Sequence, residues 1–244
     1  MSGHSKWATT KRRKFAVDAK RSAAFTKLAN NITIAARSGS DPIMNFKLRM
    51  AIDKARSFNV PRENIDRAIK KGAGELEGAQ IKEEIYEGFG PSGIALIIEA
   101  ITDNTNRTVS AIKHTLQDHG GSLGGPNSVM WQFERKGVVR LTINDKLQTT
   151  DDKEKLELKL IDLGVDDLII DDEGITVYTK IENLQKIKET LEKDNLTVES
   201  AQLEFVPKET VKITDSEIVK KVEALFEALD DLDDVSEHYT NADI

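Results

Sequence analysis

The first 21 residues, MSGHSKWATTKRRKFAVDAKR, combine many cations with aromatic rings, a pattern typical of nucleic-acid binding. Lys and Arg side chains neutralise phosphates, and an aromatic ring between them can stack on an unpaired base. Residues 1–14 carry no apolar repeat that would fold them onto a core, so we expect a tail that becomes ordered on its partner. The alternative, a solubilising arm, would not need the Trp. The residues expected to bind nucleic acid are His4, Lys6, Trp7, Lys11, Arg12, Arg13, Lys14, Lys20, Arg21 and Lys27.

Charge is distributed unevenly along the 244 residues. Residues 1–72 carry a balance of +12 and residues 73–244 a balance of −19, which together give the net charge of −7. This asymmetry indicates that one end of the chain meets a polyanion while the remainder avoids one. A salt-bridged, solvated surface is the alternative interpretation. Such a surface would be better served by positive and negative side chains mixed along the chain.

The loop GFGPSG contains the pattern Gly88-x-Gly90-x-x-Gly93, which matches the dinucleotide fingerprint in its letters. That fingerprint binds a pyrophosphate only where it joins a strand to a helix. Here the flanking segments both have the pattern of strands, and Pro91 removes a backbone donor. We therefore favour a hairpin turn that needs a positive φ over a nucleotide site.

The segment TDNTNRT, residues 102–108, is a dense polar stretch at the start of a predicted helix. A helix N-terminus with an added Arg can bind phosphate, and Asn104 and Arg107 are then the possible phosphate contacts. Helix capping alone explains most of the polar residues here, and we favour that interpretation.

The side chains that usually carry catalysis or bind metals are sparse and scattered. The residues His4, His114, His119 and His238 have no metal-ligand spacing, and no triad is recognisable around them. The absence of Cys excludes disulfides, thiolate catalysis and Cys-ligated metals. We therefore expect no catalytic residue, no metal and no cofactor. An enzyme that uses the 88–93 loop together with His119 is the alternative.

The composition also bears on localisation. No apolar run approaches the ~18 residues of a membrane span. The basic N-terminus is not followed by the apolar core of a signal peptide. Together with the lack of Cys, these features predict a cytoplasmic protein that binds no membrane.

Three amphipathic helices are predicted in the basic part of the chain. The first runs from about Phe15 to Ser38-Gly39, the second starts at Asp41-Pro42, and the third runs from Pro61 to Gly72. The apolar stripe of the second helix is Met44, Leu48, Ala51, Ile52 and Ala55. Seven cations are expected on the outer faces of this bundle: Arg49, Lys54, Arg56, Arg62, Arg67, Lys70 and Lys71.

The rest of the chain alternates strands and helices. Strands are predicted at 84–88, at 93–101 and at SVMWQFE, residues 128–134, with Val129, Trp131 and Phe133 on one face. Residues 137–206 have the order βαββαβ. A helix at 216–232 is expected to return and cover the first sheet, and the acidic tail 230–244 is expected to fray.

These elements predict an α+β fold of three domains. Residues 1–78 form the basic tail and a three-helix domain, and residues 79–136 plus 205–244 form a discontinuous α+β middle domain. Residues 137–204 form an inserted ferredoxin-like βαββαβ domain.

Seven segments of the chain resemble the YebC/PmpR family, whose mitochondrial relatives include the translational activator of cytochrome c oxidase. The segments are GHSKW at 3–7, DAKR at 18–21, FTKL at 25–28, AIDKA at 51–55, NVPRENIDRAIKKG at 59–72, YEGFGPSGIAL at 86–96 and TDNTNRT at 102–108. The resemblance implies the same three-domain order and a role in regulating gene expression rather than catalysis. After Trp7 the chain departs from the commonest family pattern, but the positive charge is retained.

The resemblance implies two kinds of target for the basic tail. Family members carry the label of transcriptional regulator, and others associate with the ribosome and relieve stalling. No recognition helix and no dimer zipper are visible in this sequence, which favours rRNA and the ribosome over promoter DNA and a monomer over a dimer. A protein-interaction adaptor that works through the acidic domains is a further alternative.

Overall fold

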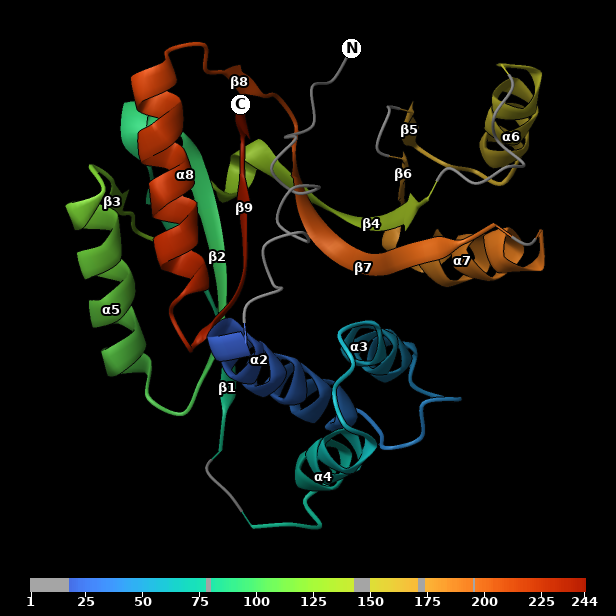
Figure 1. Cartoon of the computed structure of the whole chain (residues 1–244), viewed down its shortest axis with the longest axis horizontal. Coiled ribbons are helices and arrows are strands. Elements are labelled where there is room, and N and C mark those ends of the chain that lie inside the picture. Colours follow the sequence, from blue (N-terminus) through green and yellow to red (C-terminus); the bar gives the residue numbers. More distant parts are fainter. Residues whose placement is uncertain (1–17, 78–79, 143–149, 171–173, 195) are drawn as a thin grey trace. The chain divides into compact units, whose positions relative to one another are not determined.

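The computed structural model of the chain describes residues 18–77, 80–142, 150–170, 174–194 and 196–244, and for residues 18–21 and 150–154 it describes the backbone alone (Figure 1). The chain divides into two compact units, Met1–Glu134 with Pro207–Ile244, and Arg135–Val206. N-terminal helices precede two four-stranded sheets, which confirms the predicted α+β class. The domain boundaries given above stay a prediction.

The N-terminal helices are α2 (Asp18–Ala36), α3 (Phe46–Ser57) and α4 (Arg62–Gly72). Their shared core includes Leu28, Ile32, Leu48, Ile52 and Ile65, which are all buried. Gly72 lets α4 approach α2 closely, because a Cβ at this position would lie 2.3 Å from the carbonyl oxygen of Thr33. Apart from Met44, the apolar periodicity therefore placed this core correctly.

The predicted start of the second helix at Asp41-Pro42 is wrong. Asp41 forms a turn instead, since its carboxylate accepts from the Ile43 N–H and its carbonyl accepts from the N–H groups of Met44 and Asn45. Asn45 is the N-cap of α3, and its Oδ1 accepts from the Leu48 N–H at 3.0 Å. Met44, expected in the apolar stripe, is 85% exposed on this turn.

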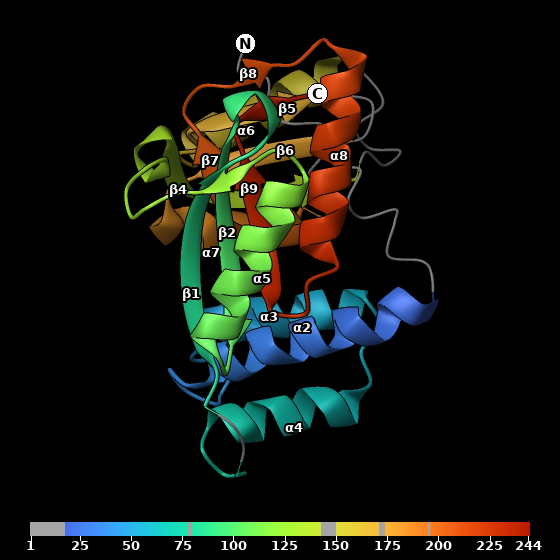
Figure 2. The same cartoon turned by 90° about the vertical axis from the view of Figure 1, so that its left-hand side faces the viewer.

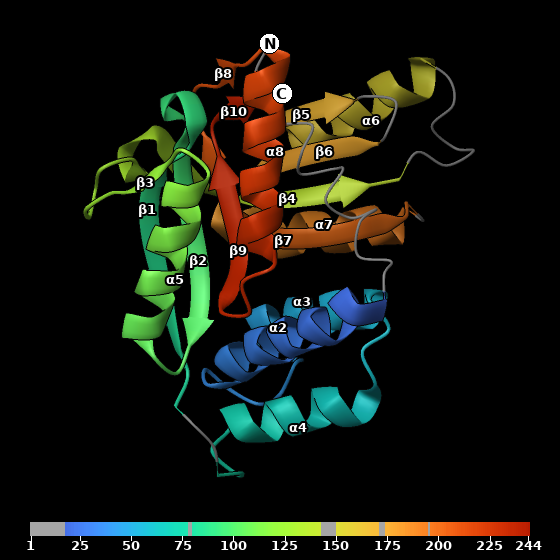
Figure 3. The ribbon, with the colours of Figure 1, turned by 60° about the vertical axis from the view of Figure 1, so that its left-hand side comes forward.

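The first sheet has the strand order β3-β1-β2-β9. Its strands are β1 (Lys82–Phe89), β2 (Ala95–Thr102), β3 (Ser122–Leu123) and β9 (Val235–Thr240). Helices α5 (Thr105–Asp118) and α8 (Ser216–Asp230) lie side by side over one face of this sheet (Figures 2 and 3). The core between them contains Leu96, Ile98, Ile112, Leu225 and Phe226. The C-terminal helix thus returns to cover the first sheet, as predicted.

The hairpin between β1 and β2 is confirmed. The strands are antiparallel, and the short helix η2 (Pro91–Gly93) turns the chain between them. Ser92 and Gly93 have φ values of 60° and 75°, the left-handed conformation that the turn requires.

The expectation that the acidic tail frays is wrong. Residues Val235–Thr240 form β9, which pairs antiparallel with β2, and β10 (Ala242–Asp243) pairs with β8 (Val211–Lys212). Val235 and Ala242 are buried, so a few apolar residues among the carboxylates anchor the segment together with its strand pairing.

The second unit has the predicted βαββαβ order. Its elements are β4 (Phe133–Leu141), α6 (Thr150–Asp162), β5 (Asp167–Ile170), β6 (Ile175–Thr179), η5 (Ile181–Asn183), α7 (Leu184–Lys193) and β7 (Val198–Pro207). The strand order β5-β6-β4-β7 is that of a ferredoxin-like sheet. Within the parts of the chain that the structure describes, no helix is long and apolar enough to cross a membrane.

Candidate nucleic-acid interface

Most of the predicted nucleic-acid contacts lie outside the described residues. These are His4, Lys6, Trp7, Lys11, Arg12, Arg13 and Lys14. Lys20 and Arg21 fall in the first turn of α2, where the backbone alone is described. The structure therefore describes the side-chain contacts of the cations of the N-terminal helices from Lys27 onward.

Lys27 and two cations of α3 point toward the first sheet and its covering helix. The Lys27 Nζ donates to the carbonyl oxygen of Asp230 at 2.5 Å, where a cation also complements the C-terminal dipole of α8. Lys54 forms an ion pair with Glu237 of β9, and Lys47 pairs with Glu83 of β1 at 3.3 Å. Lys54 is therefore not on an outer face as predicted, since its side chain is only 29% exposed. These cations join the helices to the sheet.

The cations of α4 lie on a different side of the bundle. Figures 2 and 3 show α4 on the side of α2 that faces away from the first sheet. Arg62, Arg67 and Lys70 are exposed there, and the Arg62 side chain is 92% exposed with only an i,i+4 contact of 3.7 Å to Asp66. A pair of this kind contributes little to stability. These three cationic side chains of α4 are thus available to a polyanion.

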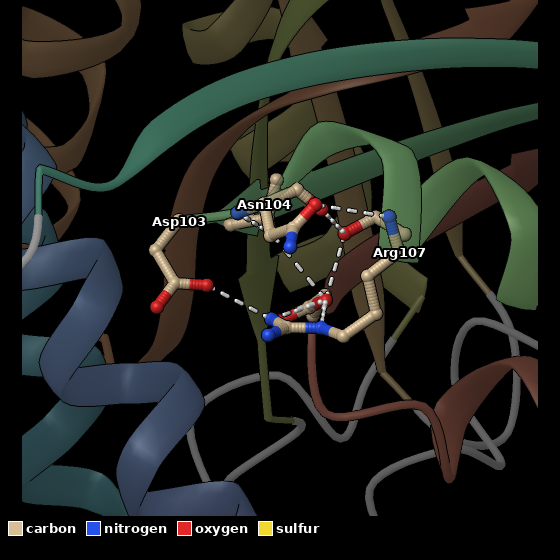
Figure 4. A network of polar contacts seen from close by, with 6 residues as sticks. Asp103, Asn104 and Arg107 are labelled. Atoms are coloured by element: carbon tan, nitrogen blue, oxygen red, sulfur yellow. Dashed lines mark hydrogen bonds and ion pairs between the residues drawn. The ribbon is translucent and has the colours of Figure 1, made fainter.

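The predicted phosphate contacts at the start of α5 are already bound within the chain (Figure 4). Asn104 is the N-cap, and its Oδ1 accepts from the Arg107 N–H at 3.1 Å. The Arg107 Nη2 donates to Asp103 and to Asp234, each at 3.0 Å. The Thr108 hydroxyl also donates to Asp234, at 2.7 Å.

This network makes Asp234 the anion at the N-terminus of α5. The hydrogen bond to Asp234 raises the pKa of the Arg107 guanidinium above its usual value. Because two carboxylates already pair with one guanidinium, an external phosphate would meet their negative charge at Arg107. The capping interpretation accounts for Asn104, and a phosphate contact at Arg107 stays a prediction.

Each histidine in the described part of the chain contacts a residue nearby in the sequence. His119 follows the last turn of α5, where its Nδ1 lies 2.8 Å from the Thr115 carbonyl oxygen. His114 pairs with Asp118 at 2.7 Å. His238 is buried in β9 against the ring of Phe226, with its Nε2 at 3.2 Å from Asp230. Across the described residues, no group of His, Asp and Glu could hold a metal ion.

Trp131 is a surface residue that the sequence analysis placed wrongly. The predicted strand at 128–134 is instead the short helix η3 (Met130–Gln132) followed by β4, and Trp131 is 67% exposed. The alternation of Val129, Trp131 and Phe133 suggested a strand face. The preceding cluster Gly124-Gly125-Pro126-Asn127 was the signal for a turn.

These features describe an α+β protein with N-terminal helices, one of which, α4, exposes several cations. Residues 5–75 match the TACO1/YebC protein N-terminal domain, and residues 81–242 match the TACO1/YebC second and third domain. The chain therefore belongs to the TACO1/YebC family.

Relatives in two bacteria align over nearly the whole chain. A protein of Thermotoga maritima is 48% identical over 99% of this chain and 93% of its own length. One of Halothermothrix orenii is 42% identical over 100% of this chain and 96% of its own. Both are named "probable transcriptional regulatory protein". The crystal structure of a conserved hypothetical protein from Aquifex aeolicus superposes with a TM-score of 0.83 at 43% identity, covering 93% of this chain and 92% of that one.

Proposed function

We propose that this protein is a nucleic-acid-binding regulator of gene expression that works without catalysis. The observation that carries the proposal is the division of the cations within the first unit. Lys47 and Lys54 are paired with carboxylates of the first sheet, whereas Arg62, Arg67 and Lys70 are exposed on the far side of α2. The strongly basic N-terminal residues precede the same helices in the sequence. The regulatory names of the relatives support this assignment.

We favour ribosomal RNA as the target, with relief of stalled translation as the role. Single-stranded RNA offers phosphates for a basic tail and unpaired bases for Trp7. Promoter DNA is the second candidate, because the relatives are named as transcriptional regulators and because α4 exposes Arg62, Asn64 and Arg67 after a short turn. Sedimentation with ribosomes at low salt and release at high salt would support the first target. A sequence-dependent shift of promoter fragments over non-specific competitor would support the second.

The test of nucleic-acid binding is the salt dependence of affinity for single-stranded RNA. If ~6 phosphates are neutralised, the log–log salt slope is expected near about −4. Replacing Lys11, Arg12, Arg13 and Lys14 by Ala should abolish binding at moderate salt without lowering the melting temperature. The triple variant Arg62→Ala, Arg67→Ala, Lys70→Ala should weaken binding and reduce the slope by about 2 units.

A matched control comes from the second unit, where Lys155, Lys186 and Lys193 are also exposed. Their replacement by Ala removes the same charge from a surface outside the proposed interface. Equal loss of affinity in this control and in the α4 variant would show that net charge alone governs binding. Unchanged binding by the four-residue tail variant would overturn the proposed function of the tail.

A further inference from the structure

Trp131 is unusually exposed for a tryptophan, because burying a large aromatic side chain normally contributes much to stability. With 67% of its surface accessible, it differs from the aliphatic residues that fill the cores of the described chain. An exposed large aromatic at a fixed position is typical of a binding site. The question is what holds the ring there and what it would bind.

The turn that carries Trp131 is held by a buried carboxylate. Glu87 of β1 is 8% exposed, and its two oxygens accept from the backbone N–H groups of Asn127, Val129 and Met130 at 2.6, 2.8 and 2.7 Å. Charge-assisted hydrogen bonds of this kind are among the strongest in proteins. Asn127 takes a left-handed φ of 64°, which bends the chain so that these three donors converge.

Both the side chain and the backbone of Trp131 are held by hydrogen bonds. Its Nε1 donates to the Ser128 carbonyl oxygen at 3.2 Å, and its own carbonyl oxygen accepts from Lys208 Nζ at 2.8 Å. Gln132, the next residue, accepts from the Lys208 N–H at 2.8 Å and from the Asn241 side chain at 3.1 Å. The ring therefore stands on a short helix that is tied to three other segments of the first unit.

This arrangement suits stacking on a nucleobase. Because the indole N–H is already bonded to Ser128, the ring offers its face rather than a polar edge. Lys208, whose Nζ donates to the Trp131 carbonyl oxygen, is exposed and places a cation beside the residue that carries the ring. An aromatic face with a nearby cation is the combination that binds a base and its phosphate in single-stranded nucleic acids.

We propose that Trp131 is a second stacking site for an unpaired base, separate from the basic N-terminal tail. This inference rests on the proposed binding of nucleic acid. It assigns the ring one class of ligand, the bases of a single strand, because bases in a duplex are already stacked on each other. Glu87 is the positioning residue that holds the turn under the ring.

The chain contains two tryptophans, Trp7 and Trp131, so their fluorescence can be separated. The variant Trp7→Phe leaves Trp131 as the sole tryptophan. Titration with a labelled oligouridylate of about 12 nucleotides should quench the Trp131 emission along the same curve as the anisotropy of the label. A duplex RNA of the same length should bind without this quenching.

Affinity gives the second readout. Trp131→Ala should weaken oligouridylate binding about 10-fold, while Trp131→Phe, which keeps a ring, should lose much less. The salt slope should stay unchanged in both, because no phosphate contact is removed. The exposed position predicts a melting temperature close to that of the unsubstituted protein.

The outcomes separate this inference from the function on which it rests. Anisotropy that does not change for the unsubstituted protein at low salt would overturn nucleic-acid binding itself. Binding that leaves Trp131 emission and the affinity of Trp131→Ala unchanged would overturn only the stacking site. Equal quenching by the duplex would also contradict stacking on an unpaired base.

Discussion

At the scale of single residues, Asp234 shows how the chain supplies its own anion to a helix N-terminus. Its carboxylate accepts hydrogen bonds from Arg107 and Thr108, and its backbone carbonyl accepts from the Ile101 N–H at 2.8 Å. The network joins the segment before β9 to the end of β2 and the start of α5. Its role is therefore to hold the C-terminal segment in place.

Asp234→Asn should lower the free energy of unfolding by about 1 kcal/mol, since the Thr108 hydroxyl loses a charged acceptor. Asp103→Asn is the matched control and should cost little, because Asp103 is an exposed i,i+4 partner of Arg107. Urea unfolding of both variants measures the difference. Equal effects would show that the network acts only through its exposed ion pairs.

Only part of this network could be predicted from the sequence. Asn104 as a cap follows from local chemistry, since its acceptor and the Arg107 N–H are three residues apart. Asp234 lies 127 residues from Arg107, and no spacing rule connects them. The same limit applies to Lys27 and Lys54, whose partners belong to the last part of the chain.

At the scale of elements, the competition between two capping residues decides where α3 begins. Asp41-Pro42 has the composition of a helix start, yet Asn45 also donates through its Nδ2 to the carbonyl oxygens of Ala35 and Gly39, at 2.8 and 2.7 Å. Asn45 thus satisfies the end of α2 and the start of α3 together. Sequence patterns predict that a helix exists more reliably than they predict its first residue.

Asn45→Ala should therefore destabilise the protein by about 2–3 kcal/mol, because the cap is lost and the carbonyl groups of Ala35, which is buried, and Gly39 lose their partner. Asp41→Ala, which removes the capping residue expected from the sequence, should cost less than about 1 kcal/mol because its side-chain bond to Ile43 is exposed. Thermal unfolding of the two variants gives the comparison. The reverse order of melting temperatures would contradict the assignment of Asn45 as the cap.

At the scale of the whole molecule, the first unit is built from both ends of the chain. Val235 and Ala242 are buried in the same core as Ile98 and Ile112, and His238 lies opposite Ile98 in the sheet. The acidic composition of residues 230–244 concealed the strand β9, since only a few apolar residues of this segment enter the core. Hydrophobic periodicity could predict β2 and α8 but not the strand that pairs with β2 after them.

Truncation after Asp234 should therefore lower stability by more than about 4 kcal/mol, because it removes a sheet strand and opens the core. A control that removes only Asp243 and Ile244 keeps β9 and should cost far less. Circular dichroism during thermal unfolding reports both. A chain truncated after Asp234 that melts like the full-length protein would contradict the role of β9.

The position of β9 also sets the order of events while the protein is being made. Helices α2 to α4 and the β1–β2 hairpin leave the ribosome early, and the βαββαβ segment follows, whereas Asp234 and Glu237 are synthesised after all of these. Lys54 and Arg107 therefore have no access to these two carboxylates until the βαββαβ segment and α8 have been translated. Until then the cations of the first helices and of α5 carry more uncompensated positive charge than in the folded protein, and the arrival of β9 and the residue before it is the event that partly neutralises them.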